Sequence, residues 1–524
     1  MLAAGALACG AASVWGAPPG SGPVRPCASP QRGGKSAAPD PATLDELSKQ
    51  LRESEPARRR SAVRGLVRLG RPDAWRLVME ALEDADSGVA DEAQLSLASL
   101  MDPKLRKELL GRGGLGSKDE LVAHRVAELL GRSKQALVGD ELARLVGEHR
   151  GALARPLCWS VERLAQSGRI AGATERLGAT LLRAAGSTSD RDAACAALVA
   201  LAQLKEPHAE RMALEALRAT WSERRVAGLI ALERVGSSHA LASAIKLAAD
   251  EDPRVRLAAL DTLDVLGSRA SMTALVARLG LEQRVRLRWR IVDLLQNASG
   301  LKHRLDPRPW KLWIETIPAD GVLRRPAPNK GAGDPNVSRT AFTGLPLISD
   351  RVCYLFDFSG SMWTPLADGR IPKDIVSEKL RAALEGLSPE TEFNLIPFTN
   401  EPIPWSEGAQ PATPKNLRAA LEFFLACRER GRGNFLDAAL LAARDPRIDT
   451  ICVLTDGVPT GGSHSDMDLI TPILVEHTRF RRVVVDSILV DAPPGAARRW
   501  GELSRLTGGR SIEVELKPAA EGAK

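Results

Sequence analysis

The segment Arg351-Val-Cys-Tyr-Leu-Phe-Asp-Phe-Ser-Gly-Ser361 decides the fold of the C-terminal part of the chain. Its short apolar run predicts a buried strand, and the polar residues that follow predict a tight turn at the strand end. A second apolar run, Thr450-Ile-Cys-Val-Leu-Thr455, is followed in the same way by Asp456-Gly457. Both predicted strands therefore deliver a carboxylate, Asp357 and Asp456, at their carboxyl ends.

Predicted strands and amphipathic helices alternate around these two runs. We expect strands at 351–357, 392–398, 450–455, 483–490 and 511–514, and helices at 373–387, 415–426, 435–443, 466–480 and 497–507. This order predicts an α/β Rossmann-like domain with a doubly wound parallel sheet over residues 341–515. In such sheets a ligand binds at the carboxyl ends of the strands.

The turn after the first strand has the spacing D-x-S-x-S, so it offers the carboxylate of Asp357 and the hydroxyls of Ser359 and Ser361. Asp456 adds a second carboxylate from a strand expected to lie alongside. Oxygen ligands of this mixture suit a hard cation that keeps some of its water. We therefore expect Mg²⁺, with Mn²⁺ or Ca²⁺ as alternatives.

These residues resemble the metal-ion-dependent adhesion site of von Willebrand factor A domains. The likeness extends over the run from Gly344 to Met362, over Leu454-Thr-Asp-Gly457 and over Leu503-x-x-Leu-Thr-Gly-Gly509. The resemblance implies that Ser359 and Ser361 coordinate the metal directly. It also implies that Asp357 and Asp456 lie close by and accept hydrogen bonds from metal-bound waters or hydroxyls. An acidic residue of a partner protein would complete the coordination sphere.

One position departs from the family pattern. The family supplies a threonine from a loop that usually reads Gly-Thr-Asn, whereas here the loop Gly431-Arg-Gly-Asn-Phe-Leu-Asp437 places Gly433 at that position. Asn434 or a water molecule could substitute for the missing hydroxyl, since Mg²⁺ tolerates extra waters. The expectation is a weakened metal site, and a metal-free domain stays open as the alternative.

The chain from Leu44 to Leu301 repeats one helical pattern with a period of roughly 30–37 residues, the length of a helix pair. Asp252-Pro-Arg-Val-Arg256, which opens the clearest of these helices, resembles the start of the second helix of a HEAT repeat. Because one pair cannot cover its own apolar face, the pattern predicts a stacked all-α HEAT-like solenoid over residues 43–316, with about eight repeats. Tetratricopeptide repeats are the alternative, but their aromatic and glycine signature is absent from this sequence. Trp310 and Trp313 are expected to cap the last repeat.

The remaining segments are expected to be a possible signal peptide at 1–17, linkers at 18–42 and 317–340, and a tail at 516–524. The apolar run Met1–Ala17 predicts an exported protein, periplasmic, extracellular or bound to the cell envelope, with a cytoplasmic location as the alternative. No transmembrane segment is expected.

The charge and the cysteines exclude several classes of protein. The chain has 72 basic and 65 acidic residues, a net charge of +7, and much of the arginine lies on polar helix faces, so nucleic acid is not an expected ligand. The seven cysteines show no CxxC spacing, so a structural zinc site is not expected. Cys353 and Cys452 fall on neighbouring predicted strands and are expected to be buried free thiols.

The motif also argues against catalysis. A phosphatase of the haloacid dehalogenase type needs a second carboxylate two residues after the first, where Ser359 stands. A serine nucleophile would need a histidine, and the one candidate, His464, is expected in the loop that opens the next helix. We therefore predict a non-enzymatic protein-binding protein whose solenoid offers a second binding surface on its concave face. A metal-free scaffold that assembles through its helices is the alternative, and a lyase-type enzyme built on the HEAT-like fold is a remote one.

Overall fold

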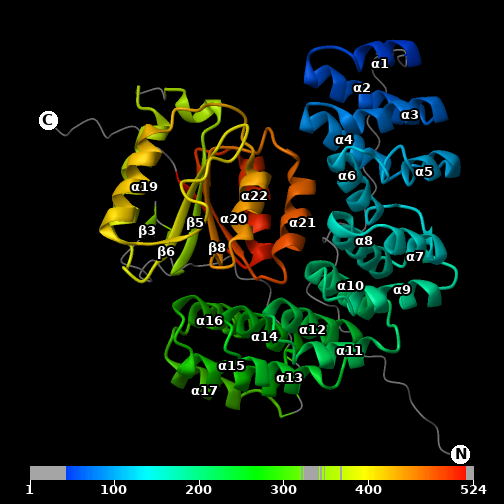
Figure 1. Cartoon of the computed structure of the whole chain (residues 1–524). Coiled ribbons are helices and arrows are strands. Elements are labelled where there is room, and N and C mark those ends of the chain that lie inside the picture. The colour runs from blue at the N-terminus through cyan, green and yellow to red at the C-terminus, as the bar shows by residue number, and fades with distance from the viewer. Residues whose placement is uncertain are drawn as a thin grey trace, which may run out of the picture.

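The computed structural model describes residues 43–319, 321, 323, 341–342, 345–346, 349–365 and 369–514. The expected signal peptide, the first linker, the tail and most of the second linker lie outside the described residues. Figure 1 shows two parts, an arc of helices and an α/β domain held inside that arc.

Helices α1 to α17 build the first part. Their bounds are α1 Leu44–Gln50, α2 Pro56–Leu69, α3 Pro72–Glu80, α4 Ser87–Leu97, α5 Pro103–Leu109, α6 Glu120–Leu130, α7 Gly139–Glu148, α8 Ala154–Gln166, α9 Glu175–Ala185, α10 Arg191–Gln203, α11 Ala209–Ala216, α12 Ser222–Val235, α13 Ala240–Leu247, α14 Pro253–Leu266, α15 Arg269–Leu281, α16 Val285–Ser299 and α17 Pro307–Glu315. Short 3-10 turns η1 (Ala81–Glu83) and η2 (Gly151–Leu153) and a two-residue parallel strand pair, β1 (Leu137–Val138) with β2 (Ile170–Ala171), are inserted between them.

Successive helices form eight pairs, followed by α17, over the described residues. The second helix of each pair, from α2 to α16, contacts the second helix of the next pair, so these helices form one continuous row. That row is the inner side of the arc in Figure 1. One apolar core runs through the whole array, from Leu47 to Ile317. The predicted HEAT-like solenoid is therefore confirmed.

Asp-Pro pairs start several of the solenoid helices. Asp252 accepts a hydrogen bond from the Arg254 backbone N–H at 2.8 Å, and Pro253 occupies the first turn, where its missing N–H costs nothing. The same helix ends at Gly267, whose φ of 58° is the left-handed conformation that glycine adopts without strain. Helices α5 and α17 begin with the same Asp-Pro pair.

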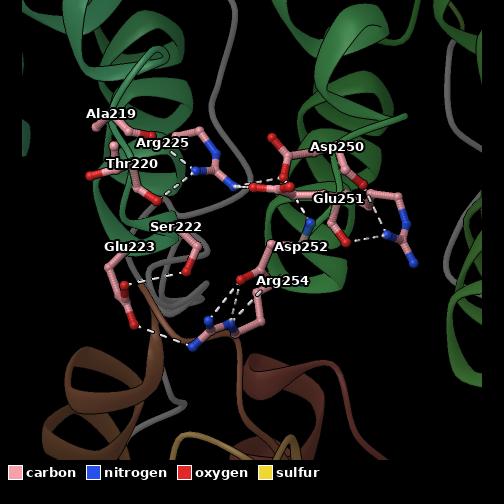
Figure 2. Close-up of polar contacts among 10 residues, drawn as sticks. Ala219, Thr220, Ser222, Glu223, Arg225, Asp250, Glu251, Asp252 and Arg254 are labelled. Carbon is pink, nitrogen blue, oxygen red and sulfur yellow. Dashed lines mark hydrogen bonds and ion pairs between the residues drawn. The ribbon is translucent and has the colours of Figure 1, made fainter.

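A recurring arginine joins neighbouring repeats. In Figure 2, Arg225 of α12 donates to the carbonyl oxygens of Ala219 (2.9 Å) and Thr220 (3.1 Å) in the preceding turn and pairs with Asp250 at 2.8 Å. Both charged side chains of this pair are nearly buried. The arginine thus supplies hydrogen bonds to carbonyl oxygens of the turn that lack a backbone partner among the described residues, and its ion pair fixes the spacing between repeats. It recurs as Arg59 with Asp84 and as Arg256 with Glu282.

Helix α17 closes the solenoid. Trp310 is fully buried, donates from Nε1 to the Arg304 carbonyl oxygen at 2.8 Å and meets the Trp313 ring edge-on at 6.1 Å. This is the aromatic cap expected from the sequence.

The α/β domain is built on a six-stranded sheet with the order β10-β9-β8-β5-β6-β7. The bounds are β5 Arg351–Asp357, β6 Glu392–Phe398, β7 Gln410–Pro411, β8 Thr450–Thr455, β9 Val484–Val490 and β10 Ser511–Val514; the helices are α18 Pro372–Glu385, α19 Pro414–Ala426, α20 Phe435–Arg444, α21 Met467–Thr478 and α22 Pro494–Thr507, with the 3-10 turn η3 at Gly360–Trp363. Two further short strands, β3 (Ala341–Phe342) and β4 (Leu345–Pro346), form an antiparallel pair outside this sheet. Five strands of the sheet pair in parallel as predicted, and the unpredicted β7 pairs antiparallel at one edge, where Pro411 is tolerated.

Helices cover both faces of the sheet. One core packs residues of α20, α21 and α22 against the sheet, and the other packs residues of α18 and α19. Cys353 belongs to the first core and Cys452 to the second, because Cys452 lies opposite Tyr354 in the register. Their side chains point to opposite faces, so both are buried free thiols, as predicted.

The solenoid docks on the α/β domain along its inner row of helices (Figure 1). Arg125 of α6 donates to the Ser463 carbonyl oxygen at 2.6 Å, and Arg286 of α16 pairs with Asp449 at 2.7 Å. The concave face was expected to be a second surface for partner proteins. In the structure the chain's own domain occupies much of it, because arginines and carboxylates on the inner helices match the domain's loops and edge. No helix among the described residues has the length and apolarity needed to cross a membrane.

Candidate metal site

The ends of β5 and β8 meet at one edge of the sheet. The two strands pair in parallel up to Phe356 and Leu454, so Asp357 and Thr455 leave the sheet side by side. The Thr455 hydroxyl donates to Asp357 Oδ2 at 2.7 Å and ties the strand ends together. Asp456 follows directly, which places the two carboxylates as neighbours.

The turn after β5 brings two hydroxyls to the same edge. The Ser359 backbone N–H donates to Asp357 Oδ1 at 2.8 Å, and this bond shapes the turn. The hydroxyl oxygens of Ser359 and Ser361 lie 3.2 Å apart. Asp357 is buried, Ser359 and Asp456 are half-buried, and Ser361 is exposed, so the group opens to the solvent on the Ser361 side.

The electrostatics of this group fit a cation. Burial raises the pKa of the Asp357 carboxyl, the neighbouring Asp456 raises it further, and the hydrogen bonds from Thr455 and Ser359 act in the opposite direction. Among the described residues, no hydrogen bond or ion pair engages the Asp456 carboxylate. Two adjacent carboxylates and two adjacent hydroxyls are the donor set that a divalent cation with retained waters would take. Within the same described residues no cluster of three or more His, Cys, Asp or Glu side chains forms a metal site, so serine hydroxyls and waters would supply the other ligands.

Gly433 lies where the family's threonine would stand. Its loop approaches the first turn through a bridge between Gly431 and Ser359. A Cβ built on Gly433 would lie 3.5 Å from Asp357 Oδ2 and 3.6 Å from Oδ1, which are ordinary contact distances. Space for a side chain directed at Asp357 is therefore present although the residue lacks one.

Asn434 performs a structural task in the same loop. Its amide oxygen accepts a weak hydrogen bond from the Asp437 backbone N–H at 3.4 Å as the N-cap of α20, and its amide nitrogen donates to the Asn400 carbonyl oxygen at 2.8 Å. The side chain is buried, with 3% of its surface exposed. Metal ligation by Asn434 stays a prediction, and it would have to compete with these contacts.

Three polar residues that sequence reasoning did not single out hold the site together. Thr455 joins the strand ends. The Thr460 hydroxyl accepts from the Gly433 N–H at 3.0 Å, and the Asn400 side chain accepts from the Arg432 N–H at 3.0 Å. Asn400 could have been found because it follows a predicted strand at the same edge. Thr460 could not, since it comes from the middle of a long loop.

An arginine-rich rim borders the site, formed by the exposed residues Arg428, Arg430 and Arg432. The Arg430 guanidinium lies over the ring of Trp363 at 4.6 Å, next to the turn that carries Ser361. Lys373 is enclosed by the rings of Phe358, Trp363 and Phe424 at 5.5–5.9 Å. Glu429 is exposed in the same segment and Arg432 pairs with Asp86 of the solenoid at 2.7 Å, so the rim carries both signs of charge with an excess of positive charge.

His464 does not belong to this site. Its ring is 5% exposed, and Nε2 lies 3.3 Å from the Gln94 side-chain oxygen of the solenoid. It lies in the loop before α21, as expected, whereas Asp466 caps that helix. Within the part of the chain that the structure describes, the Ser359 and Ser361 hydroxyls bond to each other and not to a histidine.

Comparisons with known proteins found similarity for both parts of the chain. Residues 350–494 match the von Willebrand factor type A domain. Inter alpha-trypsin inhibitor heavy chain 4 of Mus musculus is 33% identical over 130 residues, which are 22% of this chain and 13% of that protein. Among solved structures, a von Willebrand factor type A protein from Catenulispora acidiphila is 17% identical, with a TM-score of 0.27, and the match covers 32% of this chain and 39% of that one. An archaeal HEAT-like repeat protein from Thermococcus onnurineus NA1 is 15% identical, with a TM-score of 0.29, over 43% of this chain and 97% of that one.

The protein therefore combines a HEAT-like helical solenoid with a C-terminal von Willebrand factor type A domain, which we call the VWA domain. The chain spans only a small part of the length of the curated relatives it matches.

Proposed function

We propose that the VWA domain binds a protein partner through a divalent cation and that the chain is not an enzyme. Ser359 and Ser361 would hold Mg²⁺, or Mn²⁺ or Ca²⁺ in its place, while Asp357 and Asp456 accept hydrogen bonds from its waters. The observation that carries the proposal is the meeting of two carboxylates and two hydroxyls at an open sheet edge. A carboxylate of the partner protein would complete the coordination of the cation.

The rim of the site supports an acidic partner. Arg428 and Arg430 are exposed in the rim with Glu429 between them, and the excess of positive charge attracts negatively charged side chains and disfavours basic ones. Val458, next to the site, is an exposed apolar residue that a partner could cover.

Export belongs to the proposal as well. It rests on the apolar run Met1–Ala17. N-terminal sequencing of protein expressed with its native start tests it. Cleavage near Gly16 or Ala17 supports export, and an intact Met1 in a secretion-competent host contradicts it.

Thermal unfolding of the full chain with Mg²⁺ or with EDTA tests the cation site. A cation present at ten times its Kd stabilises the folded state by about 1.4 kcal/mol, which is measurable as a rise in the unfolding midpoint. Ser361→Ala and Asp456→Asn should reduce this rise. Thr364→Ala is the matched control, because Thr364 directly follows the same exposed turn and its hydroxyl donates, within the described residues, only to the Gly360 carbonyl oxygen.

A wild-type midpoint that does not respond to Mg²⁺, Mn²⁺ or Ca²⁺ would refute the cation site. The second candidate function, a metal-free scaffold, would then be favoured, and Gly433 in place of a threonine ligand is the observation behind it. Partner binding that persists in excess EDTA distinguishes this scaffold from a cation-dependent binder.

A further inference from the structure

The solenoid clamps the loop that follows Asp456. Asp91 of α4 is 1% exposed, and its Oδ2 accepts the backbone N–H groups of Ser465 at 2.7 Å and Asp466 at 2.8 Å. Its Oδ1 accepts from Arg125 at 2.6 Å, and Arg125 also donates to the Ser463 carbonyl oxygen at 2.6 Å. One buried ion pair of the solenoid therefore holds three residues of the VWA domain: Ser463, Ser465 and Asp466.

Most hydrogen bonds that this ion pair makes with other groups form only when the two parts are docked. A buried charge pair costs free energy unless hydrogen bonds complete it. Gln94 takes part by accepting from Arg125 at 2.9 Å and by contacting His464. The hydrogen bonds that Asp91 Oδ2 accepts from the described residues all come from the VWA domain. The clamp is thus built for this loop and does not serve the solenoid alone.

The clamped loop reaches the candidate metal site at its other end. It starts at Asp456, and its Gly457 carbonyl oxygen accepts from Trp500 Nε1 at 2.8 Å. In its middle, Thr460 makes two hydrogen bonds with Gly433, one through its hydroxyl at 3.0 Å and one through its N–H at 3.2 Å. Fixing residues 463–466 therefore restricts the loop that carries Asp456 and the loop that carries Gly433.

A second contact ties the other site loop to the same helix. Arg432, next to Gly433, pairs with Asp86 at 2.7 Å. Asp86 is the N-cap of α4 and accepts the Gly88 and Val89 N–H groups with its other oxygen. Helix α4 thus contacts both loops that complete the site, through two carboxylates one and a half turns apart.

We propose that Asp91 and Asp86 of the solenoid are positioning residues of the cation site, so that docking of the solenoid and binding of the cation are coupled. Because coupling between two sites is reciprocal, the cation strengthens docking by the same factor by which docking strengthens cation binding. A ligand that displaces α4 would weaken binding of the cation. This inference rests on the proposed cation site.

Titration of the full chain with Mn²⁺ or Mg²⁺, followed calorimetrically, tests the coupling. Asp91→Asn removes the charge that Arg125, Ser465 and Asp466 share, and we expect an apparent affinity on the order of fivefold lower, the lower end of typical couplings. Asp86→Asn keeps a good N-cap but loses the ion pair with Arg432, so a smaller decrease is expected. Asp250→Asn is the control, since it breaks another nearly buried ion pair, whose contacts lie within the solenoid.

Amide hydrogen exchange of residues 457–466 provides the second measurement. Asp91→Asn should accelerate exchange there, whereas Asp250→Asn should not. If wild type binds the cation and Asp91→Asn binds it as tightly as Asp250→Asn does, the coupling is refuted while the cation site stands. If wild type binds no cation, the cation site and the coupling both fail. If Asp91→Asn is too unstable to titrate, the cation affinities of Asp86→Asn and Asp250→Asn are compared instead. A lower affinity of Asp86→Asn supports the coupling, and equal affinities refute it.

Discussion

Replacing Gly433 by threonine should tighten cation binding. The structure leaves room for the change, because a Cβ at this position meets nothing closer than 3.5 Å and the backbone is not in the left-handed region. The two hydrogen bonds between the Gly433 backbone and Thr460 do not involve the new side chain. The added hydroxyl would then stand beside Asp357, where the cation site lacks a protein ligand.

The magnitude follows from the water that the hydroxyl replaces. Immobilising an ordered water costs between about 0 and 2 kcal/mol, so a tethered hydroxyl should gain about 1 kcal/mol, or roughly a fivefold decrease in Kd. Loss of glycine also reduces the freedom of the unfolded chain, which stabilises the protein by about 0.4–1 kcal/mol with or without a cation. These two effects must be separated.

Gly433→Val separates them, since valine has the shape of threonine without the hydroxyl. Calorimetric titration with Mg²⁺ and with Mn²⁺ should give a lower Kd for the threonine variant than for the valine variant and wild type. The unfolding midpoints in EDTA should rise for both variants. Equal Kd values for the threonine and valine variants would show that Gly433 does not face the cation, and the reasoning about the third loop would be wrong.

Three further predictions concern the stability and chemistry of the whole chain. Burial, followed by the nearby positive charge of Arg125, lowers the pKa of His464 well below its ordinary value, so the unfolded chain binds this proton more readily than the folded one. The free energy of unfolding should therefore fall as the pH drops below about 6.5, by at most about 1.4 kcal/mol per pH unit for this group. The loss should be smaller in His464→Gln. Urea unfolding of the two proteins between pH 7 and 5 checks this, and equal pH dependences would contradict it. Trp310→Ala should lower the free energy of unfolding in urea by about 3–5 kcal/mol, as for other fully buried tryptophans. Trp313 is half-buried, so Trp313→Ala should lower it clearly less. Similar losses for the two variants would show that Trp310 is not the main residue of the cap. Burial raises the pKa of the Cys158 thiol to about 12, so this thiol should resist alkylation by iodoacetamide at pH 8 in the native protein and react once the chain is unfolded; rapid native labelling, located by mass spectrometry, would count against the packing.

The fold could be predicted in large part because its signals are local. Apolar runs such as Thr450–Thr455 and periodic helices with Asp-Pro starts report directly on strands and helices. The parallel order of the sheet then follows from the alternation. The edge strand Gln410–Pro411 was missed because two residues give no pattern, and its pairing depends on β6 being at hand.

The candidate site likewise has residues that the sequence predicts and contacts that it does not. Asp357, Ser359, Ser361 and Asp456 come together because parallel strands end at one edge of the sheet, which the sequence already implies. Whether they bind a cation stays a prediction. The contact of Thr460 with Gly433 depends on the packing of one loop against another, and no spacing in the sequence reports on it.

Docking of the solenoid was the part least accessible from sequence. Asp91 and Ser465 are 374 residues apart, and neither stands in a motif. Charged residues on a solenoid helix are usually solvated, so the expectation of a free concave face was the natural one. Only the curvature of the arc brings the inner arginines and carboxylates against the α/β domain.

Because one polypeptide carries both the arc and the domain inside it, their association does not depend on the concentration of the protein. A tether gives the second partner an effective concentration in the millimolar range, so contacts too weak to join separate molecules suffice here. The ion pairs at this surface that lie out of water, such as Arg479 with Glu162, are also screened little by salt. The VWA domain should therefore stay docked on the solenoid when the protein is diluted. An external protein that binds the inner face of the solenoid would have to compete with a domain tethered to the same chain.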